Sequence, residues 1–179
     1  MIDAMGLADP ALAEQRVASV FERIHREQMA GLPLLNSALT VATIGFQSFR
    51  SRVIGIVSTP WMMSLVLLPG VDDQWQSLGL GEKQSHDFPA GTYRFLVNIL
   101  DGLGVCQMHS VYSPMRDFPN QASAVAAARD FLERLMVPAP AVDGEVPVDE
   151  ELLGRILRGE DIPEIDTALA SAALEPVSP

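Results

Sequence analysis

Cysteine and histidine, the residues that most often build metal and redox sites, are scarce in this sequence. The 179 residues include one cysteine, Cys106, and three histidines. A single cysteine excludes an intrachain disulfide framework and every all-cysteine zinc or iron–sulfur site within this sequence. Such cysteine usage is typical of a reducing compartment, so we expect a cytoplasmic protein.

Basic residues are also few, with 12 Lys and Arg against 23 Asp and Glu and a formal net charge of −11. A nucleic-acid-binding protein needs basic side chains to neutralise phosphates, so we expect no nucleic acid among the partners. The longest apolar stretch, residues 53–68, is interrupted by Ser58-Thr59-Pro60 and is shorter than the roughly 20 residues that span a bilayer. The N-terminus shows no export signal, and we expect no direct membrane insertion.

Apolar residues make up 48% of the chain, which is enough to offset the entropy cost of ordering it, so we expect a folded domain. Asp9 followed by Pro10 is typical of a helix start, and Gly31-Leu32-Pro33 is typical of the matching end. Asn120 predicts the start of a second helix, in which apolar residues recur at helical spacing as far as Leu135.

Between these helices the pattern changes to short apolar runs separated by turn residues, which predicts antiparallel strands. The predicted strands are residues 39–49, 52–57, 62–68, 92–100 and 105–112, with a long loop over residues 69–91. The run 64–68 is nearly continuous, which predicts a central strand covered on both faces. Together these elements predict an α+β fold: a two-layer sandwich with an antiparallel sheet of about five strands and both helices packed on one face.

The composition changes after Val137. Residues 138–179 hold six of the 13 prolines and ten acidic residues against two basic ones, so most of the negative charge lies there. We therefore divide the chain into a domain over residues 9–137 and an acidic, proline-containing tail over residues 138–179. Asp149 is a good N-cap for a short helix near residues 149–158, which is too short to be stable alone.

The common catalytic motifs are not found in this sequence. It has no G-x-S-x-G elbow, no phosphate loop and no G-x-G-x-x-G turn that opens a helix. Cys106 and His109 have a C-x-x-H spacing, but in a strand this spacing places the two side chains on opposite faces. Joint metal binding by these two residues would therefore be strained, and we expect no metal site.

Two polar clusters lie in the predicted loop over residues 69–91. His86 is followed by Asp87, whose carboxylate is a candidate to orient the imidazole, although a polar loop explains both residues equally well. Asp72 and Asp73 form a carboxylate pair of the kind that is usually solvated. No set of residues supplies a nucleophile, a base and an orienting group together, so we expect no catalytic residues, no enzyme activity and no cofactor.

Apolar segments interrupted by polar turn residues are the least usual feature of the chain. They cover residues 58–63, 88–91 and 112–119. Flexible thioethers and aromatic rings along one rim form the type of surface that accepts varied apolar peptides. A place in the core is the simpler explanation for any one of these residues. Taken together, the candidate client-binding residues are Trp61, Met62, Met63, Tyr112, Pro114, Met115 and Phe118.

An ordered set of motifs resembles that of a known family. The set is Met29-Ala30-Gly31-Leu32-Pro33-Leu34-Leu35-Asn36, Ile44-Gly45-Phe46, the run from Thr59-Pro60-Trp61 to Leu67-Leu68-Pro69, Phe88-Pro89-Ala90-Gly91, and Ser113-Pro114-Met115 with Phe118. The positions assigned to the structural motif are Thr59, Pro60, Pro69, Phe88, Pro89 and Gly91. From about residue 17 to residue 136 the sequence resembles the HybE family of [NiFe]-hydrogenase assembly chaperones, which includes the HupJ and HoxT proteins. The tail after Val137 lies outside this resemblance.

The resemblance implies a compact α+β accessory protein of the cytoplasm, without enzyme activity, that helps a [NiFe]-hydrogenase to mature. The implied partners are the precursors of the hydrogenase small subunit, which bears a twin-arginine signal peptide, and of the large subunit. Other maturation proteins are further candidate partners. Two alternatives stay open: a metal- or redox-handling accessory enzyme that uses Cys106, His109 and loop acids, and a structural subunit in which the Trp and Met residues are ordinary core.

Overall fold

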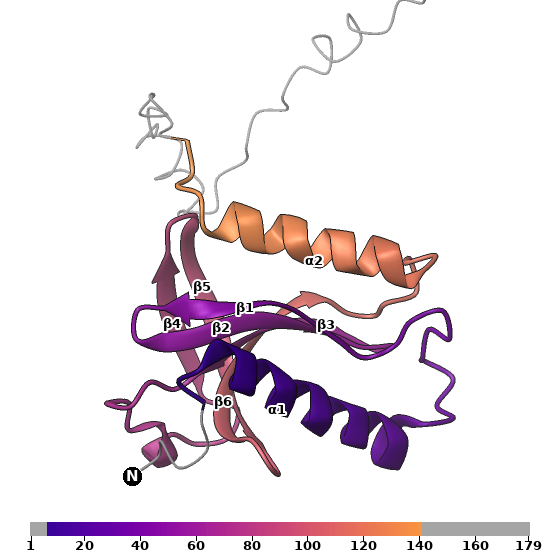
Figure 1. The fold of residues 1–179 in the computed structure, drawn as a ribbon, viewed down its shortest axis with the longest axis horizontal. Coiled ribbons are helices and arrows are strands. Elements are labelled where there is room, and N and C mark those ends of the chain that lie inside the picture. Colours follow the sequence, from indigo (N-terminus) through magenta and orange to yellow (C-terminus); the bar gives the residue numbers. More distant parts are fainter. Residues whose placement is uncertain (1–6, 141–179) are drawn as a thin grey trace, which may run out of the picture. The chain divides into compact units, whose positions relative to one another are not determined.

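The computed structural model describes residues 7–140 of the chain (Figure 1). Two helices flank a run of six strands, so the α+β class and the antiparallel sheet are confirmed. The expected acidic tail, apart from its first residues 138–140, lies outside the described residues, and so does the predicted helix near residues 149–158.

Both helices begin where their capping residues predict. They are α1, Pro10–Ile24, and α2, Gln121–Leu135, with one π-helical turn, His25–Met29, after α1. The Asp9 carboxylate accepts a hydrogen bond from the backbone N–H of Ala11 at 2.8 Å. The Asn120 side chain accepts one from the N–H of Ser123 at 2.9 Å. Each cap satisfies a backbone donor that the first helical turn leaves without a partner.

The sheet has its six strands in the order β1-β2-β3-β6-β5-β4. The strands are β1 (Ala42–Phe49), β2 (Arg52–Ser58), β3 (Met63–Leu68), β4 (Lys83–Phe88), β5 (Gly91–Leu100) and β6 (Gly104–Tyr112). Strand β4 lies within the segment 69–91, so the prediction of one long loop there is wrong. The reason is that β4 is a polar edge strand in which only Phe88 is buried, and it therefore shows no apolar alternation.

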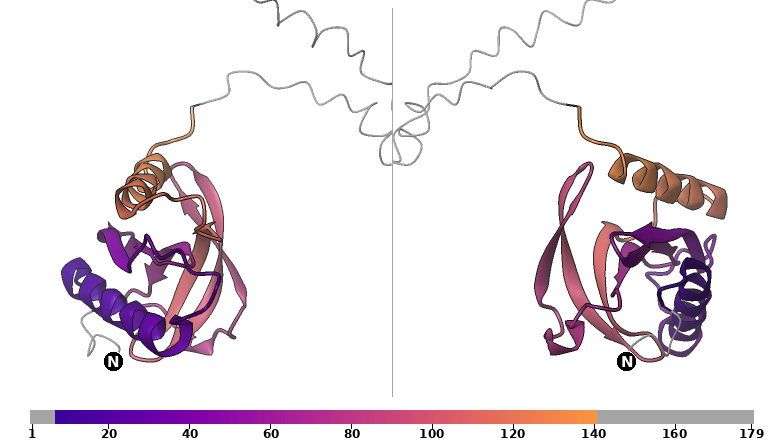
Figure 2. Two further views of the ribbon diagram at one scale, coloured as in Figure 1. Left: turned by 90° about the vertical axis from the view of Figure 1, so that its right-hand side faces the viewer. Right: turned by 60° about the vertical axis from the view of Figure 1, so that its left-hand side comes forward.

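The two helices cover opposite faces of β1 and β2 (Figures 1 and 2), which differs from the expected two-layer arrangement with both helices on one face. Val53 and Val57 of β2 belong to the core beneath α1. Ile54 and Ile56, which alternate with them, belong to the core beneath α2. All six residues of β3 are buried, as predicted for a central strand. A strand that is apolar on both faces needs a cover on each, so one helix packs on each side.

A β-bulge in β1 changes the face of the sheet on which the side chains of this strand lie. The register places Gly45 and Phe46 together opposite Gly55. Ile44 packs in the core beneath α2, whereas Phe46 packs against the core beneath α1. A Cβ atom on Gly45 would lie 2.5 Å from a methyl carbon of Leu132 in α2, and the φ angle of Gly45 is +66°. The motif Ile44-Gly45-Phe46 is therefore the sequence of a bulge that only glycine fits.

We expect Gly45→Ala to lower the free energy of unfolding by about 2–4 kcal/mol, because it adds backbone strain and overpacking against Leu132. Gly31→Ala is the matched control, since Gly31 has a φ of +82° but no atom within 4 Å of an added Cβ. The control should lose only about 1–2 kcal/mol from strain. Urea denaturation followed by circular dichroism measures both losses, and equal losses would show that the contact with Leu132 contributes nothing.

Candidate functional site

The Asn36 side chain joins three of the sequence motifs at one end of the sheet. Its amide nitrogen donates hydrogen bonds to the carbonyl oxygens of Met115 at 2.9 Å and Phe118 at 2.8 Å. Its backbone N–H donates to the carbonyl oxygen of Pro60 at 2.9 Å. One residue thus ties the segment after α1 to the β2–β3 turn and to the segment after β6.

Thr59 closes the β2–β3 turn through its hydroxyl group. The hydroxyl donates to the carbonyl oxygen of Met62 at 2.9 Å and accepts from the N–H of Met62 at 3.0 Å. Thr59 and Pro60 are both buried. These contacts hold the following Trp61 in the turn.

Exposed leucine side chains lie in the segment that Asn36 ties to this turn. Leu32 and Leu34 are 40% and 38% exposed. A hollow of about 350 Å³ lies between Leu32, Leu35, His25 and Pro60. The His25 ring lies 5.6 Å from that of Trp61, centroid to centroid. We call the surface formed by His25, Leu32, Leu34, Leu35 and Trp61 the leucine surface.

The structure divides the seven candidate client-binding residues. Met63 and Met115 are fully buried in the core beneath α2, so their side chains do not form part of a rim. This burial corrects the expectation for these two methionines. Met63 lies in β3, which is covered on both faces, and Met115, in the segment after β6, packs into the core beneath α2.

The other candidates form two groups. Trp61 and Met62 are partly buried and pack against the core beneath α1. Tyr112 is 42% exposed, and its ring lies edge-on to that of Phe118 at 5.2 Å. Pro114 is exposed. The single rim expected from the sequence is therefore two apolar patches.

The Phe88-Pro89-Ala90-Gly91 motif forms the turn between β4 and β5. Phe88 pairs with Gly91 across the turn, and the N–H of Ala90 donates to the carbonyl oxygen of Leu135 at the end of α2. Phe88 is buried in the core beneath α2. Pro69, also buried, ends β3. These residues lie at strand ends, and the Ala90 contact ties the β4–β5 turn to the end of α2.

Cys106 and His109 lie on opposite faces of β6. Cys106 is fully buried in the core beneath α1, and this burial raises the pKa of its thiol to about 12. The His109 ring instead lies 6.4 Å from the ring of Phe131 in α2. In residues 7–140 no group of three or more His, Cys, Asp or Glu side chains is arranged to hold a metal ion. This geometry does not favour the metal- or redox-handling alternative.

A polar network missed by the sequence analysis joins four segments. Arg52 binds the Asp73 carboxylate through two hydrogen bonds of 2.7 Å each. Arg52 also lies 3.2 Å from Nδ1 of His86, and Nε2 of His86 lies 2.6 Å from Oε1 of the buried Gln107. Because arginine can only donate, Nδ1 accepts and the imidazole proton lies on Nε2, directed at Gln107. The Arg52 guanidinium group also lies 5.0 Å from the ring centroid of Trp75.

This network corrects two readings of the loop residues. Asp73 is not simply solvated, and Asp87 does not orient His86, because its carboxylate accepts from the Thr92 hydroxyl instead. Arg52 holds the pKa of Asp73 below its usual value. The network links β2, β4 and β6 through contacts that are distant in sequence, so no local spacing indicated it.

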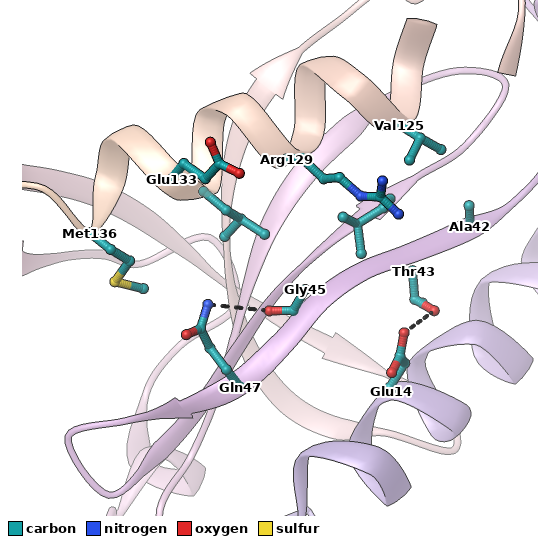
Figure 3. A pocket seen from close by; sticks show the side chains of 11 residues that line it. Glu14, Ala42, Thr43, Gly45, Gln47, Val125, Arg129, Glu133 and Met136 are labelled. Carbon is teal, nitrogen blue, oxygen red and sulfur yellow. Dashed lines mark hydrogen bonds between the residues drawn. The ribbon is translucent and has the colours of Figure 1, made fainter. Parts of the chain in front are cut away.

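A second hollow, of about 570 Å³, lies along the free edge of β1 between the two helices (Figure 3). Glu14 of α1 and Arg129 of α2 line its two walls, and Thr43 of β1 lies between them. The Thr43 hydroxyl donates to the Glu14 carboxylate at 3.0 Å. The sequence did not indicate this edge, because the alternation of residues along a strand does not show whether the strand has a neighbour on each side.

A family model described as "[NiFe]-hydrogenase assembly, chaperone, HybE" matches residues 12–164. The chain belongs to this family. This match extends beyond residue 136, where the resemblance by motifs ends, and into the acidic tail. The chain is also similar to the solution structure of HybE from Escherichia coli, with 30% identity, a TM-score of 0.58, and coverage of 73% of this chain and 82% of that one.

Individual relatives carry names that refer to hydrogenases or to rubredoxin. The chain is 36% identical over 134 residues to the "Hydrogenase expression/formation protein HoxT" of Azotobacter vinelandii, which covers 74% of this chain and 85% of that protein. It is 34% identical over 134 residues to the "Probable rubredoxin HupJ" of Rhodobacter capsulatus, covering 70% of this chain but only 48% of that longer protein. A rubredoxin centre needs four cysteine ligands, and this sequence has one cysteine.

No helix within residues 7–140 is both long and apolar enough to cross a membrane.

We expect Asp73→Asn to lower the free energy of unfolding at pH 7 by about 1–2 kcal/mol, because it removes a partly buried ion pair with two hydrogen bonds. The folded-state pKa of Asp73 is lowered, so its stabilisation is present above the unfolded-state pKa near 3.8 and is lost as the pH falls through the folded-state value. The melting temperature of the variant should therefore change less with pH below about pH 4 than that of the wild type. Asp72→Asn, at the exposed neighbour, is the control and should leave the profile unchanged.

We expect Met63→Ala to cost about 2–4 kcal/mol of unfolding free energy, because it opens a cavity in a fully buried part of the core. Tyr112→Ala removes a half-exposed ring and one aromatic contact, and it should cost about 1 kcal/mol. Urea denaturation distinguishes the two. A small loss of unfolding free energy for Met63→Ala would instead indicate that Met63 is a surface residue and again a candidate for client binding.

Proposed function

We propose that this protein is an assembly chaperone without enzyme activity that acts in the cytoplasm. It binds the precursor of a [NiFe]-hydrogenase subunit and holds it until cofactor assembly is complete. Membership of the HybE family supports the hydrogenase as the client, and the name of the Azotobacter vinelandii relative refers to hydrogenase formation. The observation that carries the binding role is the leucine surface.

The leucine surface has the properties of a site for an apolar peptide. Leu32 is exposed at the hollow, and Leu34, two residues further along the chain, is exposed as well, instead of filling the core. Asn36 fixes this segment to the β2–β3 turn, so the exposed leucines are presented on an ordered backbone. An ordered apolar surface binds at a lower entropy cost than one that must first be arranged.

The aromatic patch of Tyr112, Pro114 and Phe118 is the second part of the proposed client site. Asn36 connects it to the leucine surface, because the same side-chain amide donates to Phe118 and to Met115. Trp61 and Met62, on the leucine side, supply partly exposed rings and thioethers. We propose that a client contacts both patches at this end of the sheet.

A twin-arginine signal peptide of the small-subunit precursor is the client segment that suits this protein best. Such a peptide combines a basic stretch with an apolar one. The apolar stretch matches the leucine surface, and the net charge of −11 attracts the basic stretch. Charge then accelerates association, whereas apolar contact supplies most of the affinity.

The test mixes the purified protein with the hydrogenase small-subunit precursor, with and without its signal peptide, and measures affinity by calorimetry. We expect tighter binding to the precursor that keeps the signal peptide. Equal binding to both would remove the signal peptide from the proposal, and binding to neither subunit precursor would contradict the chaperone role.

The double variant Leu32→Ser, Leu34→Ser should weaken precursor binding at least tenfold, because it removes the exposed apolar contacts while leaving the core intact. Val71→Ser with Leu80→Ser is the matched control, since these side chains are 60% and 71% exposed and lie outside the leucine surface. If both double variants bind alike, the leucine surface is not the client site.

A further inference from the structure

The two edges of the sheet differ in how well they are protected against pairing with another strand. The sheet ends in β1 on one side and β4 on the other. β4 carries the charged residues Lys83 and Asp87, which discourage further strand pairing. β1 has the sequence A-T-I-G-F-Q-S-F and carries no charged residue. The free edge of β1 is therefore the less protected of the two, and the bulge at Gly45 and Phe46 interrupts it at one point.

The two helices make the β1 edge into a channel. Figure 3 shows α2 on one side of β1 and α1 on the other, with the 570 Å³ hollow between them. Val125 and Met136 supply apolar surface from α2. An extended chain lying here would have the edge of β1 along its length and a helix on each face.

The strand register shows which backbone groups face this channel. Phe49 pairs with Arg52 across a two-residue turn, so the backbone N–H and C=O groups of Phe49 and Gln47 point towards β2. The bulge at Gly45 and Phe46 then shifts the alternation, so that the backbone groups of Ile44, opposite Ile56, point towards β2. Thr43 pairs with Val57, whose backbone groups point to β3, as do those of other odd-numbered residues of β2. The N–H and C=O groups of Thr43 consequently face the channel. An extended peptide backbone supplies the partners that such groups need.

The charged side chains of the channel indicate the chemistry of its occupant. Arg129 extends from α2 into the hollow and, within residues 7–140, has no carboxylate within 4.0 Å (Figure 3). Glu14 on the opposite wall is already hydrogen-bonded to Thr43. Glu133, four residues along α2 from Arg129, lines the same hollow and has no basic partner within 4.0 Å among residues 7–140 (Figure 3). The unpaired charges at the strand edge are therefore one of each sign, which favours an added strand with both an acidic and a basic side chain.

We propose that the free edge of β1 binds an extended segment of the hydrogenase subunit precursor as a seventh strand of the sheet. Apolar side chains of that segment face α2, an acidic side chain pairs with Arg129, and a basic one pairs with Glu133. This proposal rests on the proposed function for the identity of its occupant. It adds a second binding site, distinct from the leucine surface, that binds the client mainly through backbone hydrogen bonds and not through apolar contact.

The test measures amide hydrogen exchange by NMR in the complex of the full chain with whichever subunit precursor binds it. The Thr43 amide should exchange at least tenfold more slowly in the complex, because it becomes hydrogen-bonded to the added strand. The Ser85 amide, at the free edge of β4, should not change. Unchanged exchange at Thr43 in a complex that does form overturns the edge proposal and leaves the chaperone role intact, whereas failure of any complex to form overturns both.

Two pairs of variants check the same site through affinity. Thr43→Pro removes the outward N–H, and we expect it to weaken precursor binding at least tenfold; Ser85→Pro makes the equivalent change on β4 and should bind normally. Arg129→Glu is exposed and keeps the fold even where the proline variant does not, and it should also weaken binding at least tenfold. Arg134→Glu, one turn further along α2 and outside the hollow, is its control.

A second copy of this chain is the competing occupant of the edge. Light scattering of the chain alone distinguishes it. A wild-type dimer that becomes a monomer on Thr43→Pro would show that the β1 edge pairs with another copy, and this result overturns the proposal. A wild-type monomer whose precursor binding falls with Arg129→Glu but not with Arg134→Glu supports it.

Discussion

The apolar character of both faces of β2 and β3 is the constraint on which the rest of the structure depends. Val53 and Val57 need a cover on one face, and Ile54 and Ile56 need one on the other. One helix cannot supply both covers, so α1 and α2 pack on opposite sides. Because both helices lie over β1 and β2, they also flank the free edge of β1, and the channel there is a consequence of covering the core.

A second organising contact is the side chain of Asn36. It has no part in the core, yet it holds the segments 29–36, 59–62 and 113–118 at one end of the sheet. The exposed leucines and the aromatic patch are therefore presented together by polar contacts. This arrangement suits a protein that must keep apolar side chains accessible and ordered at the same time, since a purely apolar contact would bury them.

Cys106 and His109 are kept apart in this fold. Its buried thiol has a raised pKa and its nearest histidine in sequence lies across the sheet, so the reactive groups are separated by the backbone itself. The most polar cluster, around Arg52 and Asp73, is engaged in joining strands to the β3–β4 connection. Apolar side chains at one end of the sheet and the free edge of β1 are among the exposed features of residues 7–140.

The sequence by itself determined the helix starts, five of the six strands, the central position of β3, and the opposite directions of Cys106 and His109, because these follow from capping and from the periods of local structure. It did not indicate β4, whose polar residues carry no alternation, or the burial of Met63 and Met115, since a methionine in a motif looks the same in a core and on a rim. Only the tertiary structure decided these points, together with the Asn36 contacts, the Arg52 network and the β1 channel. Each depends on residues that are distant in the chain and are brought together only when both faces of the sheet are covered.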